Sequence, residues 1–281
     1  MTSLWQLRAK CAADNVSGAA AAIAFFSLLT AFPGFGVILS VYGLLVDPAT
    51  IERHLGLASG LLPAAVLRLL SADVRGFLAF QRHNPSLALA LCLLFTVTSG
   101  RATVSSVITA LNVIYGKKEN RRLLHRHGVR LLLVVAILSF VAVTFALVAL
   151  SPLLIYYVLP LSRGWRHAID YLRWPILAAL MMAALTRLYS VAPNRPPQGW
   201  VNRGSGVATV LWLVFSVAYS YYLSRVGGYN VIYGSVSAPV ALLIWLYLSS
   251  LAMLLGAEID ALKWEGETWQ TDLPTPHTAS D

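Results

Sequence analysis

One charged residue stands in the middle of a long apolar stretch of this sequence. Arg101 follows TVTSG and precedes ATVSSVIT, so hydroxyl side chains flank it on both sides. A guanidinium group stays charged and carries five N–H donors, which suits it to bind phosphate, carboxylate or another anion. At the centre of a bilayer such a charge costs at least about 2.5–3.5 kcal/mol. We therefore expect Arg101 to face the interior of a helical bundle.

Two roles for this arginine stay open. It can bind an anion or a lipid headgroup on an internal path, in which case Ser99, Arg101 and Thr103 are path residues. It can equally tie helices together through their backbone carbonyl groups, in which case its role is structural.

A carboxylate near the end of the last apolar stretch is the second candidate. Glu258 lies in LLGAEIDALKW, two residues before Asp260. It can hold a proton or a cation on the same path, or balance the charge of a basic loop. A charge that merely lies near the end of a helix at the membrane surface would give the same pattern.

Other chemistry finds little support. The six histidines are scattered, and the chain has no HExxH string, no Cys/His ligand spacing, no Walker A string and no GxSxG string. We expect no metal, no other cofactor and no enzymatic activity. An enzyme at the membrane is the least favoured alternative, with His125, His127, Glu119 and Glu258 as its candidates.

The composition decides the class of protein. Of 281 residues, 58% are hydrophobic and only 12% are charged, and the mean hydropathy is +0.69. A soluble domain is nearer one quarter charged, so the chain is an integral membrane protein. Its net charge of +9 then indicates anionic lipid headgroups rather than nucleic acid as partners.

Six stretches are long and apolar enough to cross a bilayer. They predict an all-α bundle in one polytopic domain, residues 1–264, followed by a disordered cytoplasmic tail, 265–281. Pro33, Gly34 and Gly36 predict a kink in the first span. The predicted spans are 17–46, 86–115, 129–161, 174–191, 204–224 and 235–262.

Two of the connections are distinctive. Residues 47–85 combine apolar residues at helical spacing with scattered charges, which predicts either amphipathic helices on the membrane surface or a small cap on the bundle. Residues 117–130 carry six basic side chains and are expected to contact anionic headgroups.

The basic residues also predict the orientation. With a cytoplasmic N-terminus, twelve Lys and Arg lie inside and eight outside, so both termini are expected in the cytoplasm. Cys11 and Cys92 make no disulfide framework, and we expect them not to pair. A homo-oligomer is compatible with the sequence.

The string NVIYG occurs twice, at 112–116 and 230–234. Transporters are often built from inverted repeats, and a shift of 118 places the second span on the fifth. The match fails outside the five residues, however, so the sequence alone does not support a repeat.

Three longer strings carry a resemblance: AAAAIAFFSLLTAFPGF, ALNVIYG and YLSRVGGYNVIYGSVSAPVALLIWLYLSSLAMLLGAEID. On these strings, and from about residue 9 to about residue 264, the chain resembles the YihY/BrkB family of bacterial inner-membrane proteins, sometimes labelled ribonuclease BN. The resemblance implies a six-helix fold with a surface-lying segment after the first span, and a link to lipid or lipopolysaccharide export.

The resemblance also implies that each NVIYG belongs to its own motif. The motif residues are Asn112, Tyr115 and Gly116 in the first and Tyr229, Asn230 and Tyr233 in the second.

The hypothesis favoured by these observations is an ATP-independent transporter or flippase for an amphiphilic or anionic substrate such as a lipid. Gly227, Gly228 and Gly234 would serve as hinges beside the last span, together with the kink at Pro33. The alternative is a non-transporting scaffold that binds a partner protein in the envelope.

Overall fold

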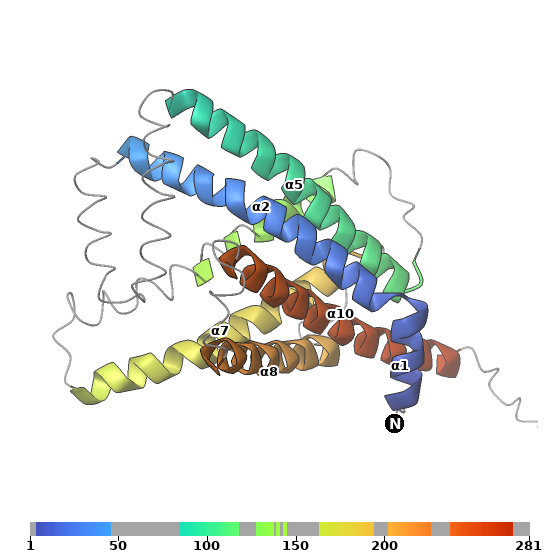
Figure 1. Ribbon diagram of the computed structural model, residues 1–281. Helices are drawn as coiled ribbons and strands as arrows, with labels where there is room; N and C mark the ends of the chain where they lie inside the picture. The colour runs from blue at the N-terminus through green and yellow to red at the C-terminus, as the bar shows by residue number, and fades with distance from the viewer. Residues whose placement is uncertain are drawn as a thin grey trace, which may run out of the picture. The chain divides into compact units, whose positions relative to one another are not determined.

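The computed structural model describes residues 4–45, 85–117, 128–137, 139–140, 143–144, 163–193, 202–225 and 237–271 (Figure 1). All regular structure in these ranges is helical, which confirms the all-α prediction for this part of the chain. The main helices are α1 (Leu4–Ala13), α2 (Val16–Leu45), α5 (Pro85–Ile114), α7 (Arg163–Val191), α8 (Arg203–Arg225) and α10 (Ser237–Thr271).

Four of the predicted spans are confirmed as helices long and apolar enough to cross a membrane. They are Val16–Val37, Ser86–Ile114, Arg203–Arg225 and Pro239–Leu262. The third and fourth predicted spans are represented by shorter apolar helices, Gly128–Ile137 and Pro175–Val191. The structure therefore supports a multi-pass membrane protein, and the number six stays a prediction.

Several helices extend beyond the spans predicted for them. α7 begins at Arg163 and passes through Pro175, and α10 ends at Thr271 within the segment predicted as a tail. α1 precedes the first span and was not expected at all. The common reason is that hydropathy marks where a chain can lie in lipid, whereas the helical hydrogen-bond ladder can continue through polar residues.

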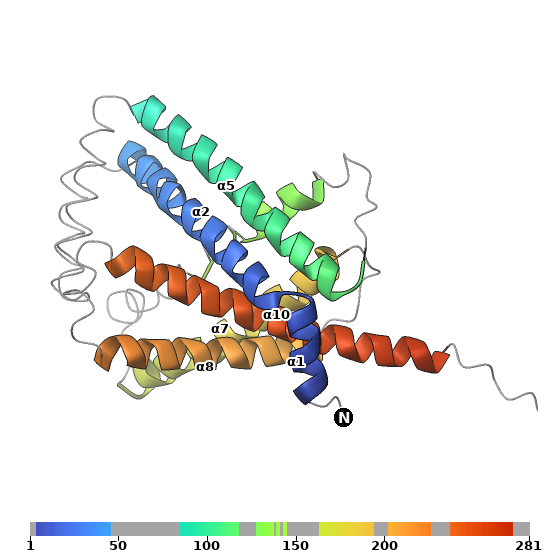
Figure 2. The ribbon, with the colours of Figure 1, turned by 45° about the vertical axis from the view of Figure 1, so that its right-hand side comes forward.

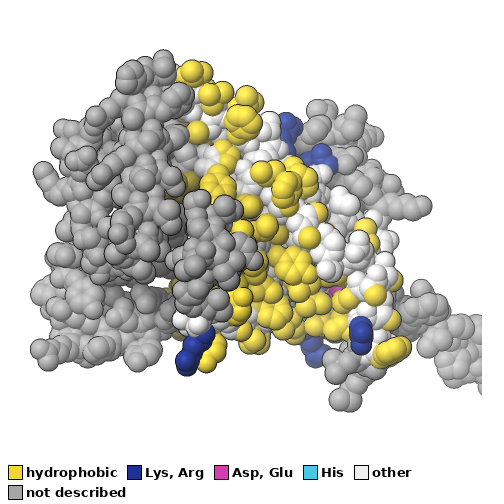
Figure 3. Space-filling model, viewed as in Figure 1, with side chains coloured by type: hydrophobic (Ala, Val, Ile, Leu, Met, Phe, Trp, Pro, Cys, Tyr) yellow, Lys and Arg dark blue, Asp and Glu magenta, His cyan; other side chains and the backbone are white. Residues whose placement is uncertain are grey.

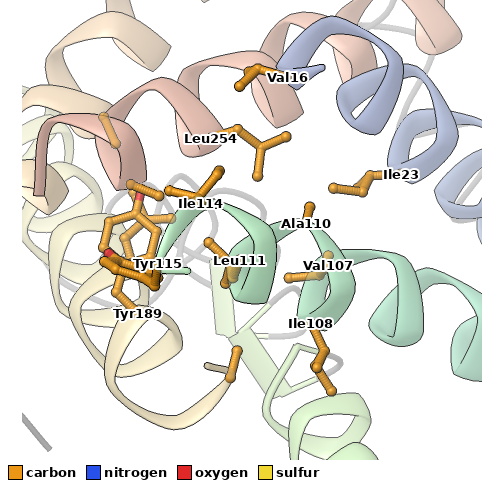
Figure 4. Close-up of a cluster of buried hydrophobic side chains, with 14 of the residues drawn as sticks. Val16, Ile23, Val107, Ile108, Ala110, Leu111, Ile114, Tyr115, Tyr189 and Leu254 are labelled. Carbon is orange, nitrogen blue, oxygen red and sulfur yellow. The ribbon is translucent and has the colours of Figure 1, made fainter. Parts of the chain in front are cut away.

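The chain divides into two compact units, one formed by Met1–Ala24 with Val104–Asp281 and the other by Phe25–Thr103. The division cuts α2 and α5, so each helix contributes one part to each unit. The first unit contains the main cluster of buried hydrophobic side chains, to which α2, α5, the helix Gly128–Ile137, α7, α8 and α10 contribute (Figure 4).

Much of the remaining described surface is apolar, as a lipid-facing protein requires. On the face shown in Figure 3, hydrophobic side chains predominate and Lys and Arg are few. Large apolar side chains such as Phe32, Phe95 and Val217 are more than half exposed. Exposure to lipid rather than to water accounts for such a surface.

The first NVIYG copy forms the end of α5. Gly116 has a positive φ of 59°, and its N–H donates to the Val113 carbonyl at 3.0 Å. The N–H of Lys117 donates to the Asn112 carbonyl at 2.8 Å, which completes a Schellman cap. This copy is thus a helix terminator, while the second copy, with Gly234, lies outside the described residues.

Candidate functional site

The second compact unit presents the polar stretch of α5. Its hydroxyl groups bond back to the helix itself: Thr96 donates to the Cys92 carbonyl at 2.6 Å, and Thr98 donates to the Leu94 carbonyl at 2.8 Å. Ser99 bonds in the same way to the carbonyl of Phe95. These bonds satisfy the hydroxyls locally, so the most polar predicted span can lie in lipid without outside partners for them.

One hydroxyl on this stretch also reaches the neighbouring helix. Thr103 Oγ1 lies 3.2 Å from Thr30 Oγ1 on α2, and a methyl group added at Gly100 would lie 3.6 Å from Thr30 Cγ2. At Gly34 on α2 the corresponding distance to Thr96 Cγ2 is 3.8 Å. Both are ordinary van der Waals contacts, so this helix pair leaves room for small side chains at its glycines.

Arg101 lies away from this contact. Thr96, Gly100 and Thr103 form the side of α5 that meets α2, and at 100° per residue Arg101 points to the other side. Its side chain is exposed, whereas the sequence pattern predicts an arginine that faces the interior of the bundle. Packing by small and hydroxyl residues on the opposite side accounts for the difference.

Exposed apolar residues precede Arg101 on its own side of α5. Leu87, Leu94 and Val97 lie at helical spacing from the arginine and are exposed. From Leu87 to Arg101 the helix rises about 21 Å. A positively charged group therefore ends an apolar stripe of roughly the length of a lipid acyl chain.

The first compact unit contains the carboxylates. Glu258 is 0% exposed and Asp260 is 5% exposed, both on α10. Tyr115, at the end of α5, donates a hydrogen bond from its hydroxyl to Asp260 Oδ2 at 2.9 Å. Charged side chains with so little exposure need polar partners, and this tyrosine supplies one of them.

The helices around the carboxylates are fixed by further polar contacts. Tyr189 of α7 is fully buried and donates a hydrogen bond to the Met253 carbonyl of α10. Thr186 of α7 donates to Ser205 of α8 at 2.8 Å. Asn202 Oδ1 accepts a bond from the N–H of Ser205 at 2.7 Å and so caps the first turn of α8. Figure 4 shows Tyr115 and Tyr189 among the buried apolar side chains.

α8 and α10 approach each other at two glycines. A methyl group added at Gly204 would lie 2.7 Å from Asp260 Cβ, and one at Gly256 would lie 2.5 Å from Ala208 Cβ. Each would also press on the backbone carbonyl of the other glycine. Only glycine, which has no side chain, permits so close a contact between α8 and α10. The contact places Asp260 of α10 next to Gly204 of α8.

Cys11 of α1 lies near the buried carboxylate Glu258. Its half-buried side chain packs against the buried cluster. Burial raises the pKa of the Cys11 thiol, and the nearby charges of Glu258 and Asp14 raise this pKa further. Cys11 and Cys92 are both free thiols.

We predict that Cys11 alkylates with a pH profile displaced to higher pH than that of free cysteine. The raised pKa means that the reactive thiolate forms only at higher pH. Alkylation of Cys11 by iodoacetamide, followed across pH 7–10 in a Cys92→Ala background, measures the midpoint. Glu258→Gln removes one raising charge and moves the midpoint down, while a midpoint unchanged by this substitution would contradict the proximity of the two residues.

The predicted path residues fall into both units. Ser99, Arg101 and Thr103 belong to the unit Phe25–Thr103, and Glu258 belongs to the other. Pro33, Gly34 and Gly36 all lie within α2, which continues through Pro33, and the kink there stays a prediction. Asp260 and the pair that it forms with Tyr115 were missed as site residues, since nothing in sequence spacing links positions 145 residues apart.

Other candidates lie outside the described residues. They are Gly227, Gly228, Tyr229, Asn230 and Tyr233, most of connection 47–85, loop residues 118–127, and the enzyme candidates Glu119, His125 and His127. Within the described ranges, no group of three or more His, Cys, Asp and Glu side chains could hold a metal ion.

Comparison with known proteins gives consistent similarity along the chain. The family model described as virulence factor BrkB matches residues 7–277. A Bacillus subtilis strain 168 protein named ribonuclease-like protein YfkH is 26% identical over 270 residues, which cover 93% of this chain and 95% of that protein. No solved structure matches the chain.

Further relatives carry a membrane-protein name. A UPF0761 membrane protein of Verminephrobacter eiseniae is 29% identical over 281 residues, 92% of this chain, and this chain spans only 61% of that protein's length. The UPF0761 membrane protein VP0125 of Vibrio parahaemolyticus is 34% identical over 115 residues, which cover 40% of this chain and 35% of that protein.

Proposed function

This chain belongs to the virulence factor BrkB family, and from that membership we propose that it moves an anionic amphiphile, such as a lipid, across a bacterial inner membrane without using ATP. The membrane setting follows from the four apolar helices and from relatives named as membrane proteins. Transport, the substrate class and the inner membrane are the proposed part.

The observation that carries the proposal is the exposed arginine within a membrane span. Arg101 lies near the middle of Ser86–Ile114, and its guanidinium group makes no hydrogen bond or ion pair with another side chain in the described ranges. An exposed charge at this depth requires water, an anion or a headgroup. An anionic ligand meets that requirement directly.

The apolar stripe next to Arg101 supports an amphiphile rather than a small inorganic ion. Leu94 and Val97 are 60% and 47% exposed and precede the arginine on the same side of α5. A lipid can place its negatively charged headgroup on the guanidinium and its acyl chain along this stripe. Such a mode of binding needs no metal and no nucleotide.

Further assignments also belong to this proposal. Both termini lie in the cytoplasm, and the basic loop 117–130 contacts anionic headgroups there. Glu258 binds the proton or cation that accompanies the substrate, which its complete burial supports. The chain has no enzymatic role and does not bind nucleic acid.

Reconstitution in liposomes tests the function. We expect the wild-type protein to move a fluorescent anionic lipid between leaflets, and Arg101→Ala to reduce the rate at least about tenfold, the equivalent of about 1.4 kcal/mol in the barrier. Arg101→Lys retains part of the rate because the charge remains. Uptake of an anionic solute, measured alongside, distinguishes lipids from soluble anions.

Arg225→Ala is the matched control. Arg225 is also exposed, but it lies at the end of α8, with its guanidinium 5.2 Å from the ring centre of Tyr221. Its removal should leave the rate unchanged. A folded wild-type protein that moves neither lipid nor solute, with or without a proton gradient, would contradict transport and leave the scaffold alternative, which capture of a partner protein would then test.

A further inference from the structure

α1 has two distinct faces. Leu7, Lys10 and Cys11 are partly buried and lie on one side of the helix, where Cys11 packs on the buried cluster. The opposite side is exposed: Trp5 is at its centre, Ala9 and Ala12 lie one and two turns further on, and Arg8 and Gln6 lie at its two edges. Packing within the protein explains the residues on the inward side of α1, but it does not explain those on the outward side.

The outward face has the composition of a helix at a membrane surface. Its centre is a tryptophan that is 75% exposed, with alanines behind it, and α1 contains two basic residues and no acidic one. Tryptophan favours the headgroup level, where its ring is apolar and its N–H is polar. Arginine next to it can bind a lipid phosphate while its stem lies along apolar surface.

The connection to α2 keeps α1 at that level. α1 ends at Ala13 and the membrane span begins at Val16, so only Asp14 and Asn15 separate them. Asn15 has a left-handed φ of 49°, and its carbonyl accepts the N–H of Ala19 to begin α2. Figures 1 and 2 both show α1 turning sharply from the first turns of α2. A helix of about 15 Å, joined in this way to a span, cannot move far from the membrane surface.

We propose that α1 is an interfacial helix that binds anionic phospholipid, with Trp5 in the boundary between headgroups and acyl chains and Arg8 on the phosphate. The occupant of the outward face is therefore the leaflet from which α2 starts. Charge complementarity and the two-residue connection to the span carry this assignment, which does not depend on whether the protein transports a substrate.

Spin labelling of the full-length protein in nanodiscs tests it. Single labels are placed at Ala9→Cys and Ala12→Cys on the outward face and at Gln6→Cys on its edge, in a Cys11→Ala, Cys92→Ala background. We expect the ratio of accessibility to oxygen over accessibility to a water-soluble nickel complex to be severalfold higher at positions 9 and 12 than at position 6. Replacing zwitterionic lipid by phosphatidylglycerol should raise this ratio further.

Arg8→Gln separates headgroup binding from simple apolar contact. It should abolish the response to phosphatidylglycerol at position 9, while Arg8→Lys should preserve most of it. Equal nickel accessibility at positions 6, 9 and 12 would overturn the proposal, because α1 would then lie in water. Protection of positions 9 and 12 from both oxygen and nickel would also overturn the proposal. Protection in discs that hold one copy of the protein would indicate contact within the chain. Protection found only in discs that hold two copies would indicate contact with a second copy.

Discussion

Alanine at Gly256 is expected to force α8 and α10 apart and to destabilise the folded protein by about 1–3 kcal/mol or more. The added methyl group would lie 2.5 Å from both Ala208 Cβ and the Gly204 carbonyl oxygen. Backbone cannot move aside as the end of a flexible side chain can. Gly204→Ala should behave alike, since its methyl group would meet the Gly256 carbonyl and Asp260 Cβ. Unfolding by SDS in mixed micelles measures the loss.

Gly206→Ala is the matched control for both substitutions. Gly206 lies on α8 one turn or less from Gly204 and Ala208, and nothing lies within 4 Å of a methyl group added there. Alanine is the better helix former by up to about 1 kcal/mol, so this variant should be as stable as wild type or more stable. If Gly204→Ala and Gly256→Ala matched it, the close approach of the two helices would be wrong.

Tyr115→Phe is expected to lower stability by about 1.5–3 kcal/mol, the range for a hydrogen bond to a charged group. The substitution keeps the ring in the buried cluster and removes the hydroxyl that donates a hydrogen bond to Asp260 at 2.9 Å. Little water can replace it, because Asp260 is only 5% exposed. The same SDS unfolding experiment provides the measurement.

Two comparisons make this experiment specific. Tyr247→Phe removes another tyrosine hydroxyl between helices, 3.0 Å from Ser17 Oγ at an exposed position, and should cost less because solvent or headgroups can replace it. Asp260→Asn should reduce the effect of Tyr115→Phe, since the bond would no longer reach a charge. Equal losses of stability for Tyr115→Phe and Tyr247→Phe, with no coupling to Asp260, would show that the buried hydrogen bond stabilises the protein no more than the exposed one.

The sequence predicts the class of this protein well and the position of its charges poorly. Apolar runs of sufficient length identify four spans because the bilayer selects for length and hydropathy, both of which are visible in sequence. The predicted direction of the Arg101 side chain was wrong because this direction depends on which side of α5 meets α2. Thr103 and Gly100 determine which side of α5 packs on α2. Both are small residues, and neither produces a strong signal in a hydropathy profile.

The buried acidic region shows a second limit. Glu258 stands out in the sequence as a charge in an apolar string, but its neighbours on other helices do not. Tyr115 is visible only as part of NVIYG, where Gly116 and the Schellman cap explain the motif locally. Its hydroxyl bond to Asp260 arises from packing of α5 on α10 and requires coordinates.

The bond between Tyr115 and Asp260 also bears on how the protein is made. A membrane protein enters the bilayer as it is synthesised, and Asp260 lies 145 residues after Tyr115. α10, the helix that brings two carboxylates into the apolar region, therefore leaves the ribosome after α5, when α5 already presents its hydroxyl. Because α5 is made first, the acidic helix is not held in lipid before its hydrogen-bond donor exists, and α5 is a prerequisite for the insertion of α10.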